Sequence, residues 1–336
     1  MSLYQDSYGN REEGNIGYAI ARDCAVMGRT FTYDLSPWGD FIPKDDPQQP
    51  MGTDLATHNM ILESILRQTA GKEMTEIAGF VPFRKYSTDT PAQVSRHDPV
   101  PSEWELVYLV SPYNCYLNTY PNDCFNQTVH SKAPFRPLKQ KRPANQIALE
   151  KKTYVCILMA DYDSALALYY WVPQIWENAG RGKIPMIWGV NPNLVETFPD
   201  IIEYMYRNAS ENDYFGADAS AAGYMNPNQV RPEYLPLFVE HNRKFYNDLD
   251  MTISPMILDF DQPSPAVKDA FAQFSPDGFA TNVMDFHNQG GRNPETHIWK
   301  GMPVIEFKNR ACDFFGHDQM SNAMSAELDA VGARPG

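Results

Sequence analysis

The stretch from Lys152 to Pro227 constrains the fold more than any other part of this 336-residue chain. It contains three short apolar runs, rich in β-branched and aromatic residues, at 153–160, 185–190 and 213–217. Segments with helical spacing separate the runs, and polar residues follow each run directly. Such an alternation is typical of a parallel β-sheet, whose strands end at a common edge where α/β folds build their sites.

The same alternation continues on both sides of this stretch. Strands are predicted at 29–35, 76–82, 104–111, 251–258, 278–283 and 303–307. Helices are predicted at 54–69, 163–180, 198–208 and 232–249, and a further one begins at Ser264-Pro265, a helix cap followed by proline. Pro173 should kink or split the helix at 163–180. Residues 87–103 and 115–150 show neither pattern and are predicted to be loops.

About nine strands in one chain of this length favour a (β/α) barrel over an open doubly wound sheet. We therefore predict an α/β fold with a single TIM-barrel-like domain, irregular or incompletely closed. The domain is expected at 29–311, with an N-terminal extension at 1–28 and a C-terminal tail at 312–336.

Charge and composition narrow the classes of partner. The formal net charge is −14 and the isoelectric point is near 4.9. An acidic chain of this kind argues against nucleic acid and against anionic membranes, and it is compatible with a neutral ligand such as a sugar. Solubility alone also explains the acidity. No run of 18 apolar residues occurs, so no membrane span is expected, and the first residues do not have the pattern of a signal peptide.

Several common site chemistries lack their motifs. The five cysteines are scattered without a Cys-x-x-Cys pair, and the seven histidines show no metal-ligand spacing. Gly-x-Ser-x-Gly and Gly-x-Gly-x-x-Gly are both absent from the sequence. We therefore expect no cofactor and no zinc or disulfide framework.

In a barrel, the residues just after the strands gather on one rim. In this chain they are mainly carboxylates, amides and aromatics: Asp34, Trp38, Lys85, Asn114, Asp161, Asp163, Asn191, Asp218, Tyr224, Asp259, Asp261, Asn282, Asp285 and Glu306. Paired carboxylates can cleave a glycosidic bond, aromatic faces pack against sugar rings, and amides hold hydroxyl groups.

We predict catalytic roles for four of these carboxylates, namely Asp161, Asp163, Asp218 and Glu306. Substrate-binding roles are predicted for Asp34, Trp38, Lys85, Asn114, Trp188, Tyr224 and Asp259. Structural roles remain open for several of them. Asp163 could cap a helix, Asp218 could shape a turn, and Trp188 could belong to the core.

The segment from Ala221 to Pro227 resembles the motif Gly-x-Gly-Tyr-x-Tyr-x-x-Pro, which names a family described as glycoside hydrolases. The family's Asp-Gly-Asp-Asn is matched by Asp161-Tyr162-Asp163-Ser164, which keeps both acids. Similar stretches occur in the same order at 34–40, 79–86, 113–116, 181–188 and 212–215, so the resemblance covers most of residues 29–260.

The chain departs from the motif in three places. Ala221 replaces the first glycine, Asn226 replaces the second tyrosine, and Gln229 stands at the proline position, with Pro227 displaced. An altered pocket or an altered sugar preference would follow from these changes.

The resemblance implies a hydrolase that acts on an oligo- or polysaccharide, and a periplasmic or extracellular location. Two alternatives remain. A carbohydrate-binding protein without catalysis is favoured by the altered motif. A metal-dependent polysaccharide esterase or deacetylase is favoured by Asp161-x-Asp163, because hard cations bind clustered oxygens.

Overall fold

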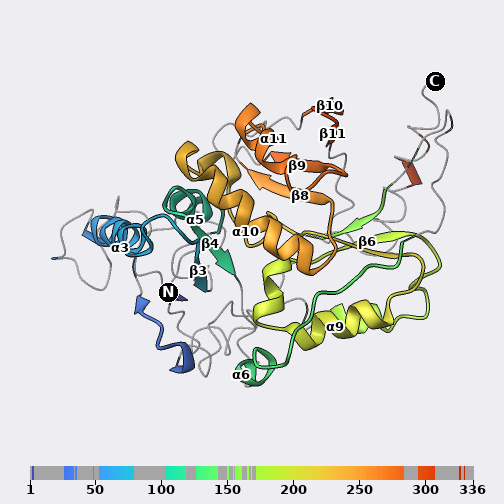
Figure 1. The fold of residues 1–336 in the computed structure, drawn as a ribbon, viewed down its shortest axis with the longest axis horizontal. Coiled ribbons are helices and arrows are strands. Elements are labelled where there is room, and N and C mark those ends of the chain that lie inside the picture. Colours follow the sequence, from blue (N-terminus) through green and yellow to red (C-terminus); the bar gives the residue numbers. More distant parts are fainter. Residues whose placement is uncertain are drawn as a thin grey trace.

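A computed structural model describes residues 172–306 most fully (Figure 1). The described residues are 2–3, 26–33, 35, 48, 53–78, 103–118, 126–142, 150, 154, 156–160, 165, 168, 172–259, 261–283, 294–306, 325–326 and 329.

The first sheet is built from the N-terminal third of the chain. Its strands are β1 (Ser2–Leu3), β2 (Thr32–Tyr33), β3 (Thr75–Ala78) and β4 (Cys115–Asn118), paired in parallel in the order β2-β1-β3-β4. Helix α3 (Thr53–Thr69) precedes β3 and buries one face, and the chain leaves it through Ala70 and Gly71, both at positive φ. The helix predicted at 54–69 and the strand predicted from 76 are therefore confirmed.

The strand predicted at 104–111 is wrong, because this segment forms α5 (Glu103–Val110) and the 3-10 turn η1 (Ser111–Tyr113). Leu106, Val107 and Val110 are fully buried on one side of the helix, whereas Tyr108 is exposed on another. An uninterrupted apolar run fits either a buried strand or a helix, so its pattern could not decide between them. The strand comes later, at β4, inside the region predicted to be a loop.

The second sheet lies in the stretch that the sequence singled out. Strands β5 (Leu158–Met159), β6 (Met186–Gly189) and β7 (Asp213–Gly216) pair in parallel in that order, as predicted. Helices α8 (Val172–Trp176) and α9 (Pro199–Asn208) and the 3-10 turn η2 (Pro192–Glu196) lie between the strands in sequence. The first turn of a helix tolerates proline, and Pro173 and Pro199 both lie in the first turn of their helices.

The third sheet contains the last four described strands of the chain. Strands β8 (Ser254–Asp259), β9 (Phe279–Val283) and β11 (Met302–Glu306) are parallel, and β10 (His297–Trp299) forms an antiparallel hairpin with β11. Helix α10 (Leu235–Asp248) runs across the front of the molecule and packs on α11 (Pro265–Phe271) (Figure 1). The predicted cap is confirmed, since the Ser264 hydroxyl accepts the Val267 N–H.

An extended strap, residues 136–142, is hydrogen-bonded to the middle of β7 and to the end of α10. The N–H of Leu138 donates a hydrogen bond to the backbone carbonyl of Asp248 at 2.8 Å. The Gln140 side chain binds both backbone polar groups of Phe215: it accepts a hydrogen bond from the N–H and donates one to the carbonyl, each at 2.9 Å. The strap thereby pairs with β7 through a side-chain amide instead of a backbone ladder.

The described strands form three sheets, and a hydrogen bond from Ala217 N to Ile253 O, 3.2 Å long, links the second to the third. Mixed helices and parallel strands confirm the α/β character. The closed barrel and the domain boundaries at 29 and 311 stay predictions. Within the described part of the chain, no helix has both the length and the apolar character needed to cross a bilayer.

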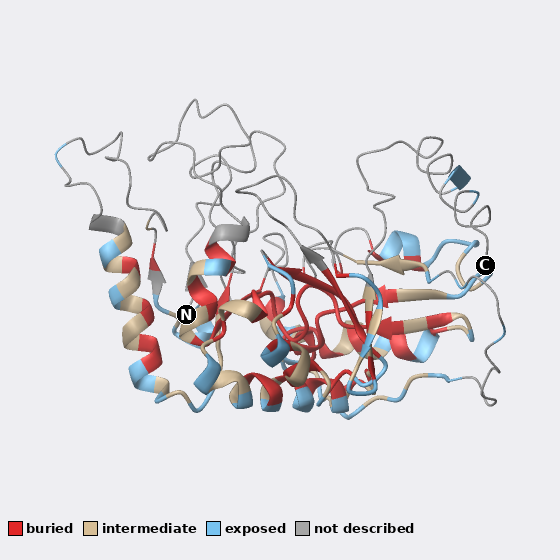
Figure 2. Ribbon diagram, turned by 90° about the horizontal axis from the view of Figure 1, so that it is seen from above, coloured by how far each residue is buried: buried red, intermediate tan, exposed pale blue. Residues whose placement is uncertain are grey.

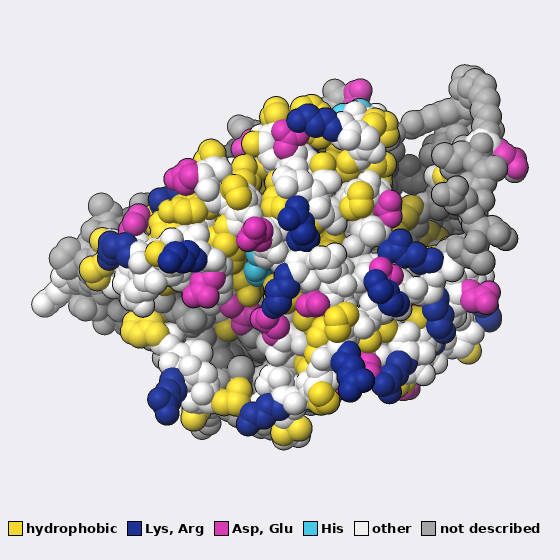
Figure 3. Space-filling model, in the orientation of Figure 1, with side chains coloured by type: hydrophobic (Ala, Val, Ile, Leu, Met, Phe, Trp, Pro, Cys, Tyr) yellow, Lys and Arg dark blue, Asp and Glu magenta, His cyan; other side chains and the backbone are white. Residues whose placement is uncertain are grey.

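The core runs through the middle strands, where buried residues concentrate in Figure 2, while the outer helices bury only one side. Ring stacking fills it, for example between Tyr206 and Phe215, whose centroids are 4.1 Å apart, and between Phe271 and Phe279 at 4.7 Å. On the face drawn in Figure 3, acidic and basic side chains are interspersed rather than segregated.

His58 on α3 makes the stability of the fold depend on pH. Its ring is buried beside Tyr33, with Nε2 3.2 Å from the tyrosine hydroxyl, and burial lowers the pKa of His58 to about 4. The unfolded chain takes up this proton near pH 6.5, before the folded chain does. The contribution of His58 to the free energy of unfolding should therefore be fully present above pH 6.5. It should be lost, by about 3 kcal/mol, as the pH drops toward 4.

Urea unfolding at pH 7, 5.5 and 4.5 tests this prediction. The variant His58→Gln should show a flatter loss between pH 6.5 and 4 than the unmodified protein. His297→Gln, on the β10–β11 hairpin, is the control and should keep the steep profile. Equal slopes for the His58 variant and the unmodified protein would contradict the prediction.

Candidate functional site

The register of the parallel strands brings their carboxyl ends to a common edge. In the second sheet Met159 pairs with Trp188, and Gly189 pairs with Gly216. A Cβ added to Gly189 would meet Ala160 at 2.8 Å, so the chain leaves β5 beside the end of β6.

The third sheet ends at an edge of its own that is joined to this one. Asp259 pairs with Val283, and Glu306 pairs with Thr281. Ser220, four residues after β7, exchanges two hydrogen bonds with Leu258 near the end of β8, at 2.9 and 3.2 Å. The segment after β7 therefore continues along β8 to its carboxyl end.

Residues 216–228, here called the motif segment, form the centre of this region. Every residue from 215 to 227 is buried, although no regular helix or strand occurs at residues 217–226. Small side chains allow this path, since the segment carries Gly216, Gly223 and four alanines. A buried irregular segment must find partners for its backbone groups, and side chains from four neighbouring elements supply them.

Side chains from the end of β6 and from α10 bind the backbone in the middle of the motif segment. Asn191, just after β6, donates its side-chain amide to the carbonyls of Ala219 at 2.7 Å and Ala221 at 3.1 Å. On α10, Asn242 accepts the N–H of Ala222 at 2.9 Å, and His241 Nε2 lies 2.8 Å from the Ala222 carbonyl. That carbonyl can only accept, so His241 carries its proton on Nε2. The segment is thus held rigidly in place.

Gly223 is required where the segment meets β4. Its φ is +107°, and an added Cβ would lie 2.2 Å from Tyr116 Cδ2. The next residue, Tyr224, pairs in antiparallel fashion with Leu117, exchanging bonds of 2.8 and 2.9 Å. Gly223 therefore allows the backbone to lie close to the Tyr116 ring, and Tyr224 can then pair with the edge of β4.

Two predicted carboxylates, Asp218 and Asp259, lie at the start of the segment and beside its end. Asp218 is 1% exposed, and its carboxylate accepts the N–H of Ala219 at 2.9 Å. Asp259 is also buried, and it accepts the N–H of Asn228 at 2.9 Å. Both side chains shape the backbone of this region. A catalytic role for Asp218 and sugar binding by Asp259 stay predictions.

Asn114 is brought to the same segment, though by a route that the sequence did not indicate. It precedes β4 instead of following a strand, in a left-handed conformation with φ of 57°. Its N–H donates to the Ser111 carbonyl, and the Ser111 hydroxyl accepts the N–H of Asn226 at 3.0 Å. Asp218 and Tyr224 thus belong to the motif segment. Asn114 is linked to it through Ser111, and Asp259 through Asn228.

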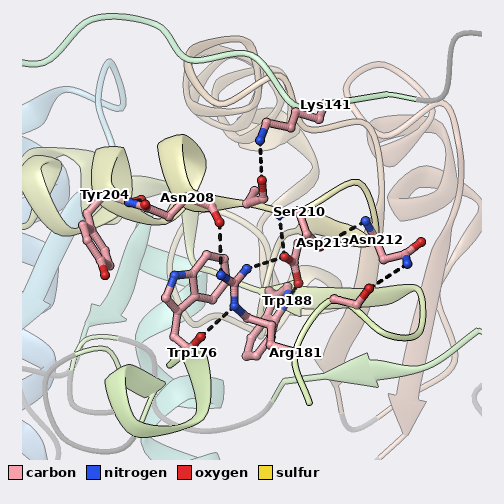
Figure 4. Close-up of polar contacts among 11 residues, drawn as sticks. Lys141, Trp176, Arg181, Trp188, Tyr204, Asn208, Ser210, Asn212 and Asp213 are labelled. Carbon is pink, nitrogen blue, oxygen red and sulfur yellow. Dashed lines mark hydrogen bonds and ion pairs between the residues drawn. The ribbon is translucent and has the colours of Figure 1, made fainter. Parts of the chain in front are cut away.

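Trp188 lies apart from them, in a structural network at the start of β7 (Figure 4). The indole is buried in the core and donates its N–H to Asp213 at 2.9 Å. Arg181 forms an ion pair with the same carboxylate and donates to the carbonyls of Trp176 and Asn208. These contacts account for Trp188 as a core residue, and its position lends no support to sugar binding.

The charge of Asp213 is fixed by this network. Burial by itself raises the pKa of Asp213, but hydrogen bonds from Ser210 and Trp188 and the charge of Arg181 outweigh it and lower that pKa. The carboxylate therefore stays ionised and paired. Since the amino-terminal face of parallel strands generally serves stability, this network is part of the scaffold.

Five predicted site residues lie outside the described residues: Asp34, Trp38, Lys85, Asp161 and Asp163. Glu306 is the last residue of β11, and its side chain also lies outside them. Within the described residues, no group of three or more His, Cys, Asp or Glu side chains could hold a metal ion.

The sequence missed the residues that hold the segment from α10 and η1. A pattern for one of them was available, since Asn242 falls on the apolar face of α10 between Phe238 and Phe245 and is fully buried. A polar residue on such a face needs a buried partner. For Ser111 and Asn226 no such pattern exists, because their partnership depends on the path of the motif segment.

A cavity of about 360 Å³ lies at the opposite edge, under the amino-terminal ends of β5 to β9. Its walls are mostly apolar, with Ile157, Met186, Tyr214 and Ile253 among them, and Arg142 reaches it from the strap. It is separate from the edge at which the predicted site residues gather.

Comparison with known proteins gives a consistent result. A family model described as "GxGYxYP putative glycoside hydrolase C-terminal domain" matches residues 151–331. Spelled in this way, the motif has its proline at the position of Pro227. The prediction that Gln229 stands at the proline position is therefore wrong, and the departures are Ala221 and Asn226.

Among solved structures, the chain is similar to a crystal structure of "a putative hydrolase from Bacteroides thetaiotaomicron", with 22% identity and a TM-score of 0.52. The similarity covers 60% of this chain and 40% of that one. At this identity the likeness concerns the fold alone. A search of curated proteins finds no match.

Proposed function

Because this chain belongs to the GxGYxYP family, whose description is that of a glycoside hydrolase C-terminal domain, we propose that it hydrolyses glycosidic bonds in an oligo- or polysaccharide. The observation that carries the proposal is the shared edge. The ends of β5, β6, β7 and β8 and the family motif itself meet in one region. A periplasmic or extracellular location is part of the same proposal.

The proposed chemistry uses two carboxyl groups from Asp161, Asp163, Asp218 and Glu306. One protonates the leaving oxygen, and the other acts as nucleophile or activates a water. We assign the central role to Asp161 and Asp163, the two acids that match the family's Asp-Gly-Asp-Asn, with Asp218 or Glu306 as the second group of the pair. The Asp218 carboxylate already accepts a backbone N–H. A separation of about 5–5.5 Å between the two groups would give retention, and about 6.5–9.5 Å would give inversion.

Asp161→Asn should lower glycan turnover by about 10²–10⁴-fold, the contribution expected of a general acid or base. The measurement is the release of reducing sugar from a panel of neutral polysaccharides. Glu177→Gln, an exposed carboxylate just after α8, is the control and should leave turnover unchanged. Undiminished turnover by the Asp161 variant would remove Asp161 from the mechanism.

A carbohydrate-binding protein without catalysis is the second candidate. It is favoured by the two motif departures, Ala221 and Asn226, which alter the segment at its buried centre. Binding of a glycan with no release of reducing sugar would establish it. Loss of activity with a chelator would instead favour a metal-dependent esterase or deacetylase centred on Asp161 and Asp163.

A further inference from the structure

Two buried carboxamides, one in the motif segment and one linked to it through Ser111, have polar atoms without hydrogen-bond partners. Asn114 is 1% exposed and Asn226 is 3% exposed. Both side-chain polar atoms of Asn114, and Nδ2 of Asn226, form no hydrogen bond within the described part of the chain. Burying such groups unpaired costs about 1–3 kcal/mol each, and native proteins retain them where they meet a water, an ion or a ligand.

The backbones of the two residues lie near each other, because one serine, Ser111, binds the N–H of each. The N–H of Asn114 donates to the Ser111 carbonyl at 3.2 Å, and the N–H of Asn226 donates to the Ser111 hydroxyl at 3.0 Å. Ser111 itself is fully buried and donates its hydroxyl to Val107 at 2.7 Å. Both backbones are therefore fixed, while the carboxamides keep unused donors and an acceptor.

The position of this pair ties it to the proposed site. Asn226 comes two residues after Tyr224, which docks on β4, and two residues before Asn228, which is bound by Asp259 at the end of β8. Asn226 also stands where the family motif has its second tyrosine. The chain thus replaces a phenol by a carboxamide at a position next to the predicted substrate-binding residues.

The chemistry of the pair selects a neutral ligand. A carboxamide offers two N–H donors and one carbonyl acceptor, and a hydroxyl group, which both donates and accepts, matches it. Neither amide carries charge, so the pair has no preference for an ionic group. The described bonds leave Asn114 able both to donate and to accept and leave Asn226 able to donate.

We propose that Asn114 and Asn226 bind hydroxyl groups of the sugar substrate and that Asn226 is a specificity-determining residue. This inference rests on the proposed function and adds the residues that recognise the sugar. Because Asn226 replaces the motif tyrosine, the preferred sugar should differ from that of relatives that keep the tyrosine.

The key variant is Asn226→Leu, which has a similar volume and no polar atoms. The backbone of Asn226 is extended, with φ of −96° and ψ of 105°, so leucine fits it. Affinity for neutral oligosaccharides of glucose, xylose, mannose and galactose, measured by titration calorimetry, should fall about tenfold. Stability in urea should stay the same or rise, since an unpaired buried amide is removed.

Asn114 needs a different substitution because its φ of 57° disfavours leucine. Asn114→Asp keeps the size and the left-handed backbone but replaces the N–H donors with an acceptor, and affinity should again fall about tenfold. Asn247→Leu, at an exposed position on α10, is the matched control and should bind as the unmodified protein does.

The outcomes separate this inference from the proposed function. Weaker binding by Asn226→Leu with full stability supports it. Unchanged binding overturns it and leaves the proposed function intact, the amides then holding internal water only. A loss of stability in Asn226→Leu also overturns it, because the amide then has a structural partner. If the unmodified protein binds no sugar of the panel, the proposed function fails and this inference fails with it.

Discussion

Replacing Asp213 with alanine should lower the free energy of unfolding by about 3–5 kcal/mol. The substitution leaves the Arg181 guanidinium without its counter-charge in a site where only 19% of that side chain is exposed. It also removes the acceptors of the Trp188 indole N–H and of the Ser210 N–H. Breaking a buried pair from one side costs more than the pair itself contributes, because the remaining charge stays buried.

Urea unfolding at pH 7 measures this loss as a shift of the midpoint at constant slope. The control is Glu203→Ala, which removes the partner of Arg207 in an i,i+4 pair on the surface of α9. That variant should change stability by less than about 0.5 kcal/mol. If both variants behave alike, the Asp213 network does not stabilise the fold in the way described.

Gly223→Ala should cost about 2–6 kcal/mol. Two effects add: a side chain at φ of +107° is strained by about 1–3 kcal/mol, and overpacking against the Tyr116 ring costs a similar amount. The added Cβ would lie 2.2 Å from that ring, which is itself buried against His241. We expect the motif segment to shift away from β4, which would also weaken any sugar binding.

Gly301→Ala separates the two effects. Gly301 also has positive φ, at +92°, but an added Cβ there would meet nothing within 4 Å. Its variant reports the backbone strain alone, and the difference from Gly223→Ala reports the collision with Tyr116. The double variant Gly223→Ala, Tyr116→Leu replaces the ring with a smaller side chain and should recover part of the lost free energy of unfolding. If Gly301→Ala and Gly223→Ala cost the same, the close approach to Tyr116 contributes nothing.

The sequence predicted elements well wherever one pattern excluded the other. Amphipathic spacing identified α3, α9 and α10, and a cap with proline identified the start of α11. It failed at residues 104–111, because a continuous apolar run fits a buried helix as well as a strand. The short strand β4 was missed for a related reason, since four residues are too few to display a period.

For the site, local pattern predicted which segments meet but not how. The rule that parallel strands end at one edge predicted that Asp259 lies near the motif segment, which contains Asp218, and the Asp259 carboxylate does accept the N–H of Asn228 in that segment. Asn114 reached the same place although the reason given for it was wrong, because it precedes its strand. The bonds from Asn242 and Ser111 depend on contacts 20 and 115 residues apart in sequence, which no local spacing encodes.

The strap has a consequence for where the folding unit begins. The family match starts at residue 151, yet Gln140 supplies both partners of the Phe215 backbone, and Leu138 is bound to the end of α10. A fragment trimmed to the matched region would leave an N–H and a carbonyl in the middle of β7 without partners. A C-terminal fragment expressed on its own should therefore start upstream of residue 136, so that it includes the strap and keeps the hydrogen bonds of the strap to β7.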